Sequence, residues 1–367
     1  SLYSNTTGYQ NTALGSSTLK DNTSGNANTA LGYNSLYENI TGSYNVGVGH
    51  ESLNKNISGD GNSALGMQSL FNNTTGDYNT AVGKSSMNKN TTGEYNTALG
   101  LSSLYSNVTG SRNLATGTYS LFSNQTGSGN VAAGNQSLFS NTTGGYNTAM
   151  GLWSLKLNTT GCRNASVGPH SLQSNTTGSS NTATGYGALK DTTTGASNTA
   201  VGRLALENNT TANYNTAVGY ETLTTNTTGA ENTALGTSSM KQNTTGTYNT
   251  AIGVASLQNN TTASYNTAVG YLSLYVNTTG AYGTAVGRRA LSANTTGAAN
   301  TAIGNDSLLS NTTGQYNTAL GSGALNQNTT ASYNVAIGLN ALVLCLSLIH
   351  ISEPTRQEAI SYAVFCL

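Results

Sequence analysis

Residues 78–83 read Tyr-Asn-Thr-Ala-Val-Gly, and residues 248–253 read Tyr-Asn-Thr-Ala-Ile-Gly. This apolar run returns every 17 residues, together with a second segment of the form Ser-Leu-x-x-Asn-Thr-Thr-Gly. The glycine that closes the apolar run is present in all 20 units, beginning with Gly15, Gly32 and Gly49. A fixed period of this length without insertions is typical of a solenoid in which each unit forms one coil.

The pattern inside each unit predicts strands and turns. Apolar residues do not recur at helical spacing over several turns, and turn-forming residues bound the short run from Asn79 to Gly83. We expect a strand, a turn, a second short strand around the leucine column (Leu19, Leu36 and Leu53) and another turn. The fold class is therefore all-β, a parallel β-solenoid or β-roll of 17-residue coils over residues 1–342. A disordered Gly/Ser/Asn-rich chain is the alternative, and the strict register argues against it.

Single coils are too small to be stable alone. Ordering 17 residues costs on the order of 25 kcal/mol, whereas each of two or three buried aliphatic side chains returns only about 1.5–3 kcal/mol. Stacking of coils must supply the difference, and it aligns identical side chains. Asn occupies the column of Asn11, Asn28 and Asn45 in 19 of 20 units, with Gly283 as the exception. We expect these amides to pair with one another along the axis.

Column chemistry suggests which side chains face the interior. The column of Leu14 is mainly aliphatic and that of Thr12 exchanges with Val and Leu, so we expect both to point inward. Between them, the column of Ala13, Ala30 and Ala81 holds almost only small residues. A small-residue column beside an aliphatic one indicates a closely packed neighbour on the other side of the strand. We expect this neighbour to be another copy of the chain around a threefold axis, a tightly wound monomer being the rival interpretation.

Composition and motifs argue against several classes of function. Only 7% of the residues are charged, against about 25% in ordinary enzymes, and the formal net charge is zero. We therefore expect no nucleic-acid binding and no membrane insertion in this segment. His50 and His170 lie seven units apart, and the cysteines lack zinc-site spacing. We expect no catalytic, metal or cofactor site, and hence no enzyme.

The last residues do not fit the repeat. Residues 346–367, which read LSLIHISEPTRQEAISYAVFCL, match in frame the translation of a transposase-type sequencing adapter. We interpret them as not native, with residues 343–345 as a junction, although a genuine apolar C-terminal segment is the alternative. We also expect the repeat array to be truncated at both ends.

The units resemble known fibrous proteins. The stretch from Tyr248 to Gly253 is similar to the Ala-Ile/Val-Gly repeats of trimeric autotransporter adhesin heads, which are left-handed parallel β-rolls of three chains with a shorter period. The array also resembles the repeat shafts of bacteriophage tail-fibre proteins. These resemblances imply a homotrimer outside the cell, on a virion tail fibre or a bacterial surface. They also imply a structural or adhesive role, with a host cell-surface glycan or protein as the receptor.

Tyrosine is frequent in the column before the Asn ladder. An exposed row of tyrosines can contact glycans or a receptor, because each ring offers an apolar face and a hydroxyl group. Packing along the solenoid edge is the alternative. The candidate contact residues are Tyr78, Tyr95, Tyr146, Tyr214, Tyr248, Tyr265, Tyr316 and Tyr333.

Asn-x-Ser/Thr sequons occur in 19 of 20 units, beginning at Asn5, and only Thr192 breaks the series. In a eukaryotic secreted protein they would be acceptor sites for N-linked glycosylation. The alternative, which we favour, is that Asn takes a left-handed turn position and the hydroxyl group satisfies a turn amide.

Abundant Thr also raises the possibility of a monomeric ice-binding β-solenoid. That function needs exposed Thr in ranks on one strand face. Thr6 and Thr7 are adjacent and so face opposite ways, and the Thr12 column behaves as a buried one. We keep ice binding as the alternative function.

Overall fold

The computed structural model describes residues 1–343, which form two compact units, Ser1–Gly187 and a second that begins at Ala188. Each unit is described by itself. The described residues contain 20 strands of three residues each and no helix. The fold class is therefore all-β in both units.

The strands of the first unit are β1 Thr12–Leu14, β2 Thr29–Leu31, β3 Val46–Val48, β4 Ser63–Leu65, β5 Thr80–Val82, β6 Thr97–Leu99, β7 Leu114–Thr116, β8 Val131–Ala133, β9 Thr148–Met150, β10 Ala165–Val167 and β11 Thr182–Thr184. Those of the second unit are β12 Thr199–Val201, β13 Thr216–Val218, β14 Thr233–Leu235, β15 Thr250–Ile252, β16 Thr267–Val269, β17 Thr284–Val286, β18 Thr301–Ile303, β19 Thr318–Leu320 and β20 Val335–Ile337.

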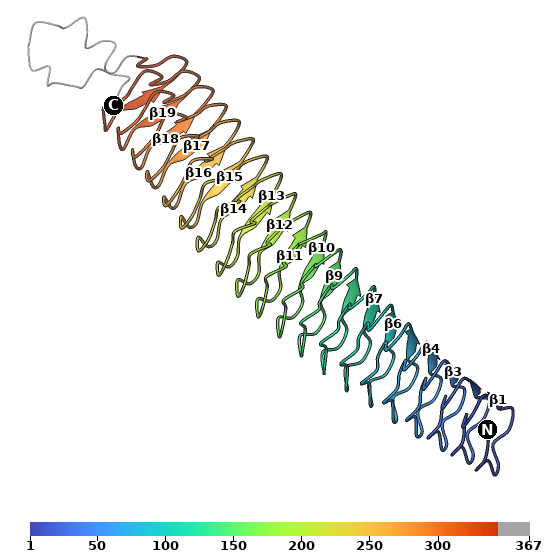
Figure 1. Ribbon diagram of the computed structural model, residues 1–367. Helices are drawn as coiled ribbons and strands as arrows, with labels where there is room; N and C mark the ends of the chain where they lie inside the picture. Colours follow the sequence, from blue (N-terminus) through green and yellow to red (C-terminus); the bar gives the residue numbers. More distant parts are fainter. Residues whose placement is uncertain (344–367) are drawn as a thin grey trace, which may run out of the picture. The chain divides into compact units, whose positions relative to one another are not determined.

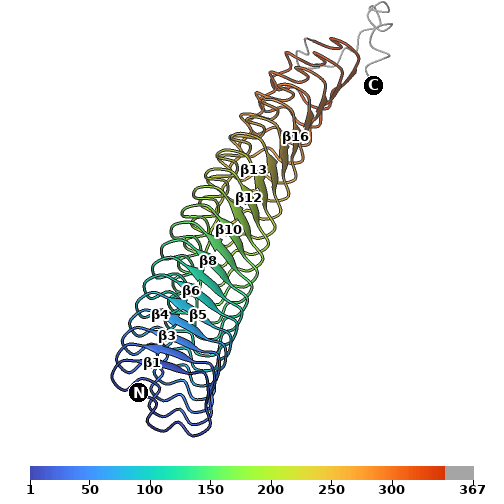
Figure 2. The same cartoon turned by 90° about the vertical axis from the view of Figure 1, so that its right-hand side faces the viewer.

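Consecutive strands within a unit pair in parallel with a shift of one repeat. In the pairing of β5 with β6, Ala81 lies opposite Ala98 and Val82 opposite Leu99. The strands therefore line one side of a stack of coils, and loops complete each coil (Figures 1 and 2). This confirms the predicted parallel β-solenoid of 17-residue coils.

The second strand predicted around the leucine column is wrong. Leu19 has a φ of 45°, and its backbone N–H donates to the carbonyl of Ser35 in the next coil at 3.1 Å. Every described coil places its leucine or methionine in this left-handed region, which L-residues adopt only at a cost of about 1–2 kcal/mol. Because hydrogen bonds to neighbouring coils continue through the turn, the backbone stays satisfied without a strand.

The predicted directions of the strand side chains are also wrong. Ala81 is fully buried, whereas the residues on either side of it are partly exposed, and the same alternation holds along the strands of both units. Leu14 is 68% exposed and Leu235 45% exposed. The Ala column therefore faces the interior, and the Thr and aliphatic columns face outward. The small-residue column is not the outer face on which we expected a second copy.

The interior explains why this column is small. It is filled by the leucine column, the Ala column, two Asn columns and a Ser column, all essentially inaccessible to solvent. At Gly47, which replaces Ala, a Cβ atom would lie 2.5 Å from Ser35 Oγ and 3.4 Å from Leu36 Cδ1. One methyl group thus already reaches the opposite wall, and a larger side chain would overpack the coil.

The invariant closing glycine has a conformational and a steric cause. Gly83 has a φ of 126°, and a Cβ atom there would lie 2.5 Å from the carbonyl oxygen of Gly100. Any other residue would be strained and would push adjacent coils apart.

The sequon asparagines form one ladder inside the coil. Asn56 donates its side-chain amide to Asn39 Oδ1 at 2.8 Å and to its own coil's Gly59 carbonyl at 2.9 Å. Its Oδ1 accepts from Asn73 Nδ2 at 2.8 Å. Hydrogen bonds between side-chain amides of successive coils are therefore most regular in the column of Asn39, Asn56 and Asn73.

The predicted ladder of Asn11, Asn28 and Asn45 is built differently. Asn45 Oδ1 accepts the backbone N–H of Asn62 at 2.9 Å, and Asn45 Nδ2 donates to the carbonyl of Gly59 at 2.8 Å. Side-chain amides of this column also contact each other in several coils, as between Asn79 and Asn62 at 3.1 Å. Both Asn columns meet at the Gly59 carbonyl. Buried amides of the two columns are satisfied within their own coil or by a neighbouring coil, and the Oδ1 atoms of Asn175 and Asn328 are exceptions.

Candidate functional site

The outer face of the strands, here called the strand face, carries two columns. One column is mostly Thr and the other is mostly aliphatic, and neither holds a charged residue. In the second unit the aliphatic column has no exception. Its members are Val201, Val218, Leu235, Ile252, Val269, Val286, Ile303, Leu320 and Ile337. Each unit thus presents an uncharged stripe of paired Thr and aliphatic side chains.

The tyrosine column lies on the surface, in the left-handed region. Tyr78 has a φ of 54° and is 56% exposed. Neighbouring rings stack along the column: the centroids of Tyr78 and Tyr95 are 5.3 Å apart, and those of Tyr248 and Tyr265 are 5.0 Å apart. Ring faces are therefore covered where tyrosines are consecutive, while edges and hydroxyl groups stay exposed. The eight candidate tyrosines belong to this column, and whether they contact a receptor stays a prediction.

The sequons do not have the predicted turn geometry. From Asn22 onward the sequon asparagines are buried, whereas Asn5 in the first coil is exposed, and none of those described has a positive φ. The hydroxyl of Thr74 donates to the carbonyl of Thr91 in the next coil at 3.0 Å, not to a turn amide. Because the side-chain amide is enclosed in the ladder, a glycan at these asparagines is incompatible with the folded coil.

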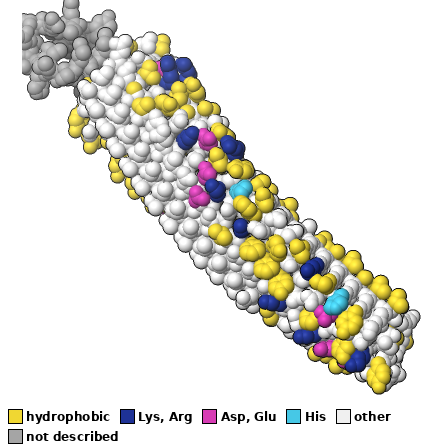
Figure 3. Space-filling view, viewed as in Figure 1, with side chains coloured by type: hydrophobic (Ala, Val, Ile, Leu, Met, Phe, Trp, Pro, Cys, Tyr) yellow, Lys and Arg dark blue, Asp and Glu magenta, His cyan; other side chains and the backbone are white. Residues whose placement is uncertain are grey.

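Most charged and many aromatic side chains gather on another face, which follows the closing glycine. We call it the variable face and define it by the columns of Ser16, Ser17, Lys20 and Asp21. In Figure 3 its charged and large hydrophobic side chains form a band beside surface that carries neither. Lys20 Nζ lies 4.8 Å from the ring centroid of Tyr37 and donates to its hydroxyl at 2.6 Å. This hydrogen bond raises the pKa of Lys20.

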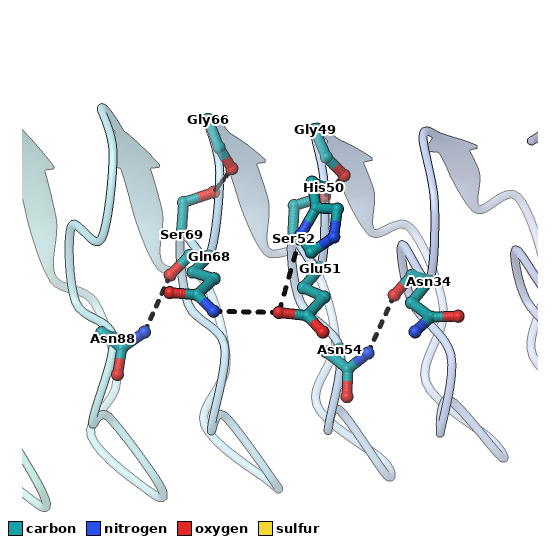
Figure 4. A network of polar contacts seen from close by, with 10 residues as sticks. All are labelled: Asn34, Gly49, His50, Glu51, Ser52, Asn54, Gly66, Gln68, Ser69 and Asn88. Atoms are coloured by element: carbon teal, nitrogen blue, oxygen red, sulfur yellow. Dashed lines mark hydrogen bonds and ion pairs between the residues drawn. The ribbon is translucent and has the colours of Figure 1, made fainter.

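Side chains of the variable face link successive coils. Gln68 donates to Glu51 at 2.9 Å, and Glu51 lies 3.6 Å from His50 Nδ1 (Figure 4). Asn54 donates to the carbonyl of Asn34 at 3.0 Å. The composition of this face changes from coil to coil, although the backbone beneath it repeats.

Two ion pairs of the second unit have clear effects on protonation. Arg289 donates to both carboxylate oxygens of Asp306, at 2.8 and 2.7 Å. This bidentate contact lowers the pKa of Asp306 and raises that of Arg289. Lys241 lies 2.6 Å from Glu221 and, through its hydrogen bond, lowers the pKa of that carboxyl group.

Residues 1–343 contain no group of three or more His, Cys, Asp and Glu side chains that could hold a metal ion. His50 stacks on Tyr33 and His170 contacts Trp153, so each histidine belongs to a separate aromatic contact. No helix long and apolar enough to cross a membrane occurs in the described part of the chain. The interpreted adapter translation, residues 346–367, and residues 344 and 345 of the junction lie outside the described residues.

Comparison with known proteins gives no family. No protein-family model matches the chain, and no curated protein is significantly similar to it.

Proposed function

We propose that the chain is a segment of an extracellular fibre that self-associates through its strand face and exposes its variable face to a receptor. The observation that best supports self-association is the stripe of exposed aliphatic side chains, in which Leu235 is 45% exposed and Ile252 is 37% exposed. A continuous apolar stripe of this kind marks an interaction surface more often than a free one. A threefold arrangement, on a phage tail fibre or a bacterial surface, follows from the resemblance stated above.

The energetics support association. Burying the exposed part of each aliphatic side chain contributes about 1 kcal/mol, since full burial is worth about 1.5–3 kcal/mol. Nine such residues in the second unit therefore supply roughly 9 kcal/mol per chain, or about 27 kcal/mol in a trimer. Each of the two association steps costs about 4–15 kcal/mol. The gain exceeds the summed cost over most of this range, which supports association.

A second copy of the chain is the occupant that suits this stripe. Its own Thr and aliphatic side chains recur at the same axial step, so a parallel copy can repeat one contact at every coil. No charged residue of either column would have to be desolvated. A threefold axis along the stripe would bring the same residue of each copy together.

Cysteine cross-linking tests this arrangement. In a background in which all three cysteines are replaced (Cys162→Ser, Cys345→Ser and Cys366→Ser), Ile252→Cys should give covalent dimers under mild oxidation, because equivalent residues meet at the axis. Thr262→Cys, at an exposed position of the Thr-Thr segment in a neighbouring coil, is the matched control and should stay monomeric on a denaturing gel. Equal cross-linking of both variants would contradict association through the strand face.

Ice binding is a second candidate, because the Thr column lies outward and not in the interior as we had expected. Regular Thr and aliphatic ranks on a parallel sheet could order water. Thermal hysteresis of the chain separates the two functions. A fibre segment whose strand face is covered should show none, whereas an ice-binding monomer should show it, and Thr233→Lys with Thr267→Lys should abolish it.

A further inference from the structure

The variable face of the first unit carries a row of three stacked rings. Tyr105, Phe122 and Phe139 occupy the same column in consecutive coils, with centroid separations of 5.1 and 5.2 Å and interplanar angles of 8° and 6°. Tyr119 packs edge-on against Phe122 at 5.6 Å. All four rings are partly exposed, so the row presents ring edges to solvent.

A serine follows each ring of the row. Ser106, Ser123 and Ser140 are the next residues in sequence, and all three are partly exposed. A ring and a hydroxyl group therefore recur together at each coil, about every 4.8 Å along the axis. A linear chain of pyranose units offers alternating C–H and hydroxyl groups at a comparable step.

Cationic side chains lie at both ends of the row. Lys89 Nζ is 5.3 Å from the ring centroid of Tyr105, and Lys156 Nζ is 4.5 Å from the ring of Trp153. The two lysines are four coils apart, which corresponds to about 19 Å at the strand spacing. Residues 95–187 contain no Asp or Glu, so the field over this part of the first unit is positive.

The spacing of the cations on this face indicates which kind of anionic polymer it can bind. A single nucleic-acid strand carries one charge about every 3.4 Å, and proteins that bind it supply a matching series of cations and open ring faces for base stacking. Here the cations are widely spaced and the ring faces are already covered by one another. A polymer with hydroxyl groups at every unit and widely spaced anionic groups fits better.

We propose that the row formed by Tyr105, Phe122 and Phe139, with Lys89 and Lys156 at its ends, binds a linear acidic polysaccharide running along the coil axis. One pyranose unit lies along the exposed edge of each ring and its serine, and carboxylate or sulfate groups lie near the two lysines. This inference deepens the receptor-binding part of the proposed function and does not require self-association.

Trp153, the only tryptophan in the chain, contacts Lys156 and reports directly on this face. The experiment titrates the full chain with a hexamer of polyuronate and follows Trp153 fluorescence, with isothermal calorimetry as a second readout. A neutral cellohexaose and an oligo(dT) of similar length are the comparison probes. We expect saturable, salt-sensitive binding of the polyuronate and at least about tenfold weaker binding of the neutral hexamer, because charged contacts are lost.

Substitutions separate the contribution of the two lysines from that of the aromatic rings. Lys89→Gln with Lys156→Gln should weaken polyuronate binding by at least about tenfold, and Phe122→Ser should weaken both hexamers, because one ring contact is lost. Lys20→Gln, which removes a lysine paired with Tyr37 outside the row, should leave the affinity unchanged; circular dichroism checks that every variant is folded. Tighter binding of oligo(dT), equal affinity for both hexamers, or no binding of any probe would overturn the proposal. Since the mass of the same sample reports on association, a monomer that binds polyuronate would contradict only the strand-face proposal.

Discussion

Asn73 donates its side-chain amide to Asn56 Oδ1 at 2.8 Å inside the first unit. Asn73 Oδ1 in turn accepts from Asn90 Nδ2 at 2.8 Å, so the asparagine joins the coil before it to the coil after it. The interior of this protein is therefore held by amide hydrogen bonds as well as by leucine burial. Such a ladder is costly to interrupt, because the groups left behind have no water to bind.

Asn73→Ala should destabilise the first unit by about 2–4 kcal/mol, since it leaves Asn56 Oδ1 and one N–H of Asn90 buried without partners at about 1–3 kcal/mol each. Native-state hydrogen exchange should show lost protection in the adjacent coils, because repeat proteins open locally. Thr75→Ala, on the exposed side of the same segment, is the control and should stay within about 0.5 kcal/mol. Equal effects of the two substitutions would contradict the role of the ladder.

The two faces of a strand should respond differently to added volume. Ala98 points inward, where one methyl group fills the space, so Ala98→Leu should cost at least about 1–3 kcal/mol by overpacking. Thr97→Val, on the outer side of the same strand, should change the free energy of unfolding by less than about 0.5 kcal/mol. Urea denaturation of both variants checks this, and a tolerated Leu at position 98 would mean that the Ala column does not face the interior.

The Arg289–Asp306 pair gives a pH dependence with a defined sign. In the folded protein the hydrogen bonds from Arg289 lower the pKa of Asp306. The ion pair therefore stabilises the fold at pH values above the unfolded-state pKa of Asp, which is about 4. This stabilisation is lost as the pH falls through the lower pKa of the folded state. Because Arg289 is 35% exposed, we expect this stabilisation to be small, as for other solvent-screened ion pairs. Asp306→Asn should therefore be less stable than the parent chain at pH 7, and the difference should shrink near pH 2. Asp191→Asn, outside these ion pairs, serves as control; a difference independent of pH would rule out this linkage.

The fold class could be predicted from the sequence because the period is strict and the glycine columns carry a steric requirement. The strand directions could not, because the rule applied was that aliphatic residues point inward. In a coil of 17 residues the leucine column and two Asn columns already fill the interior, and only Ala fits between them. The apolar pattern therefore predicts the wrong side for Leu14 and Val82, whose side chains lie on the outer face.

The candidate surfaces were only partly accessible to sequence reasoning. The exposed tyrosine column could be named, because Tyr recurs in one position of the repeat. The variable face was missed, although aligning the units by their period brings Tyr105, Phe122 and Phe139 into one column. What the alignment alone cannot provide is the contact of Lys156 with Trp153, since these residues belong to different columns and meet only through the turn geometry.

Charge placed on the strand face should disrupt association without unfolding the coils. Val218→Lys, Ile252→Lys and Val286→Lys in one chain put three cations into the aliphatic stripe, where their desolvation on association would be unfavourable. Thr228→Lys, Thr262→Lys and Thr296→Lys add the same charge at exposed positions of another face. Sedimentation velocity should give monomers for the first set and the parent's oligomer for the second.

The most direct test of the central claim is the mass of the full chain by light scattering coupled to size exclusion. One chain has a mass of 37.5 kDa, and the account predicts a monodisperse species of about three times this value, consistent with a closed threefold assembly with heterologous interfaces. A folded monomer at micromolar concentration would contradict association through the strand face and would favour the ice-binding alternative.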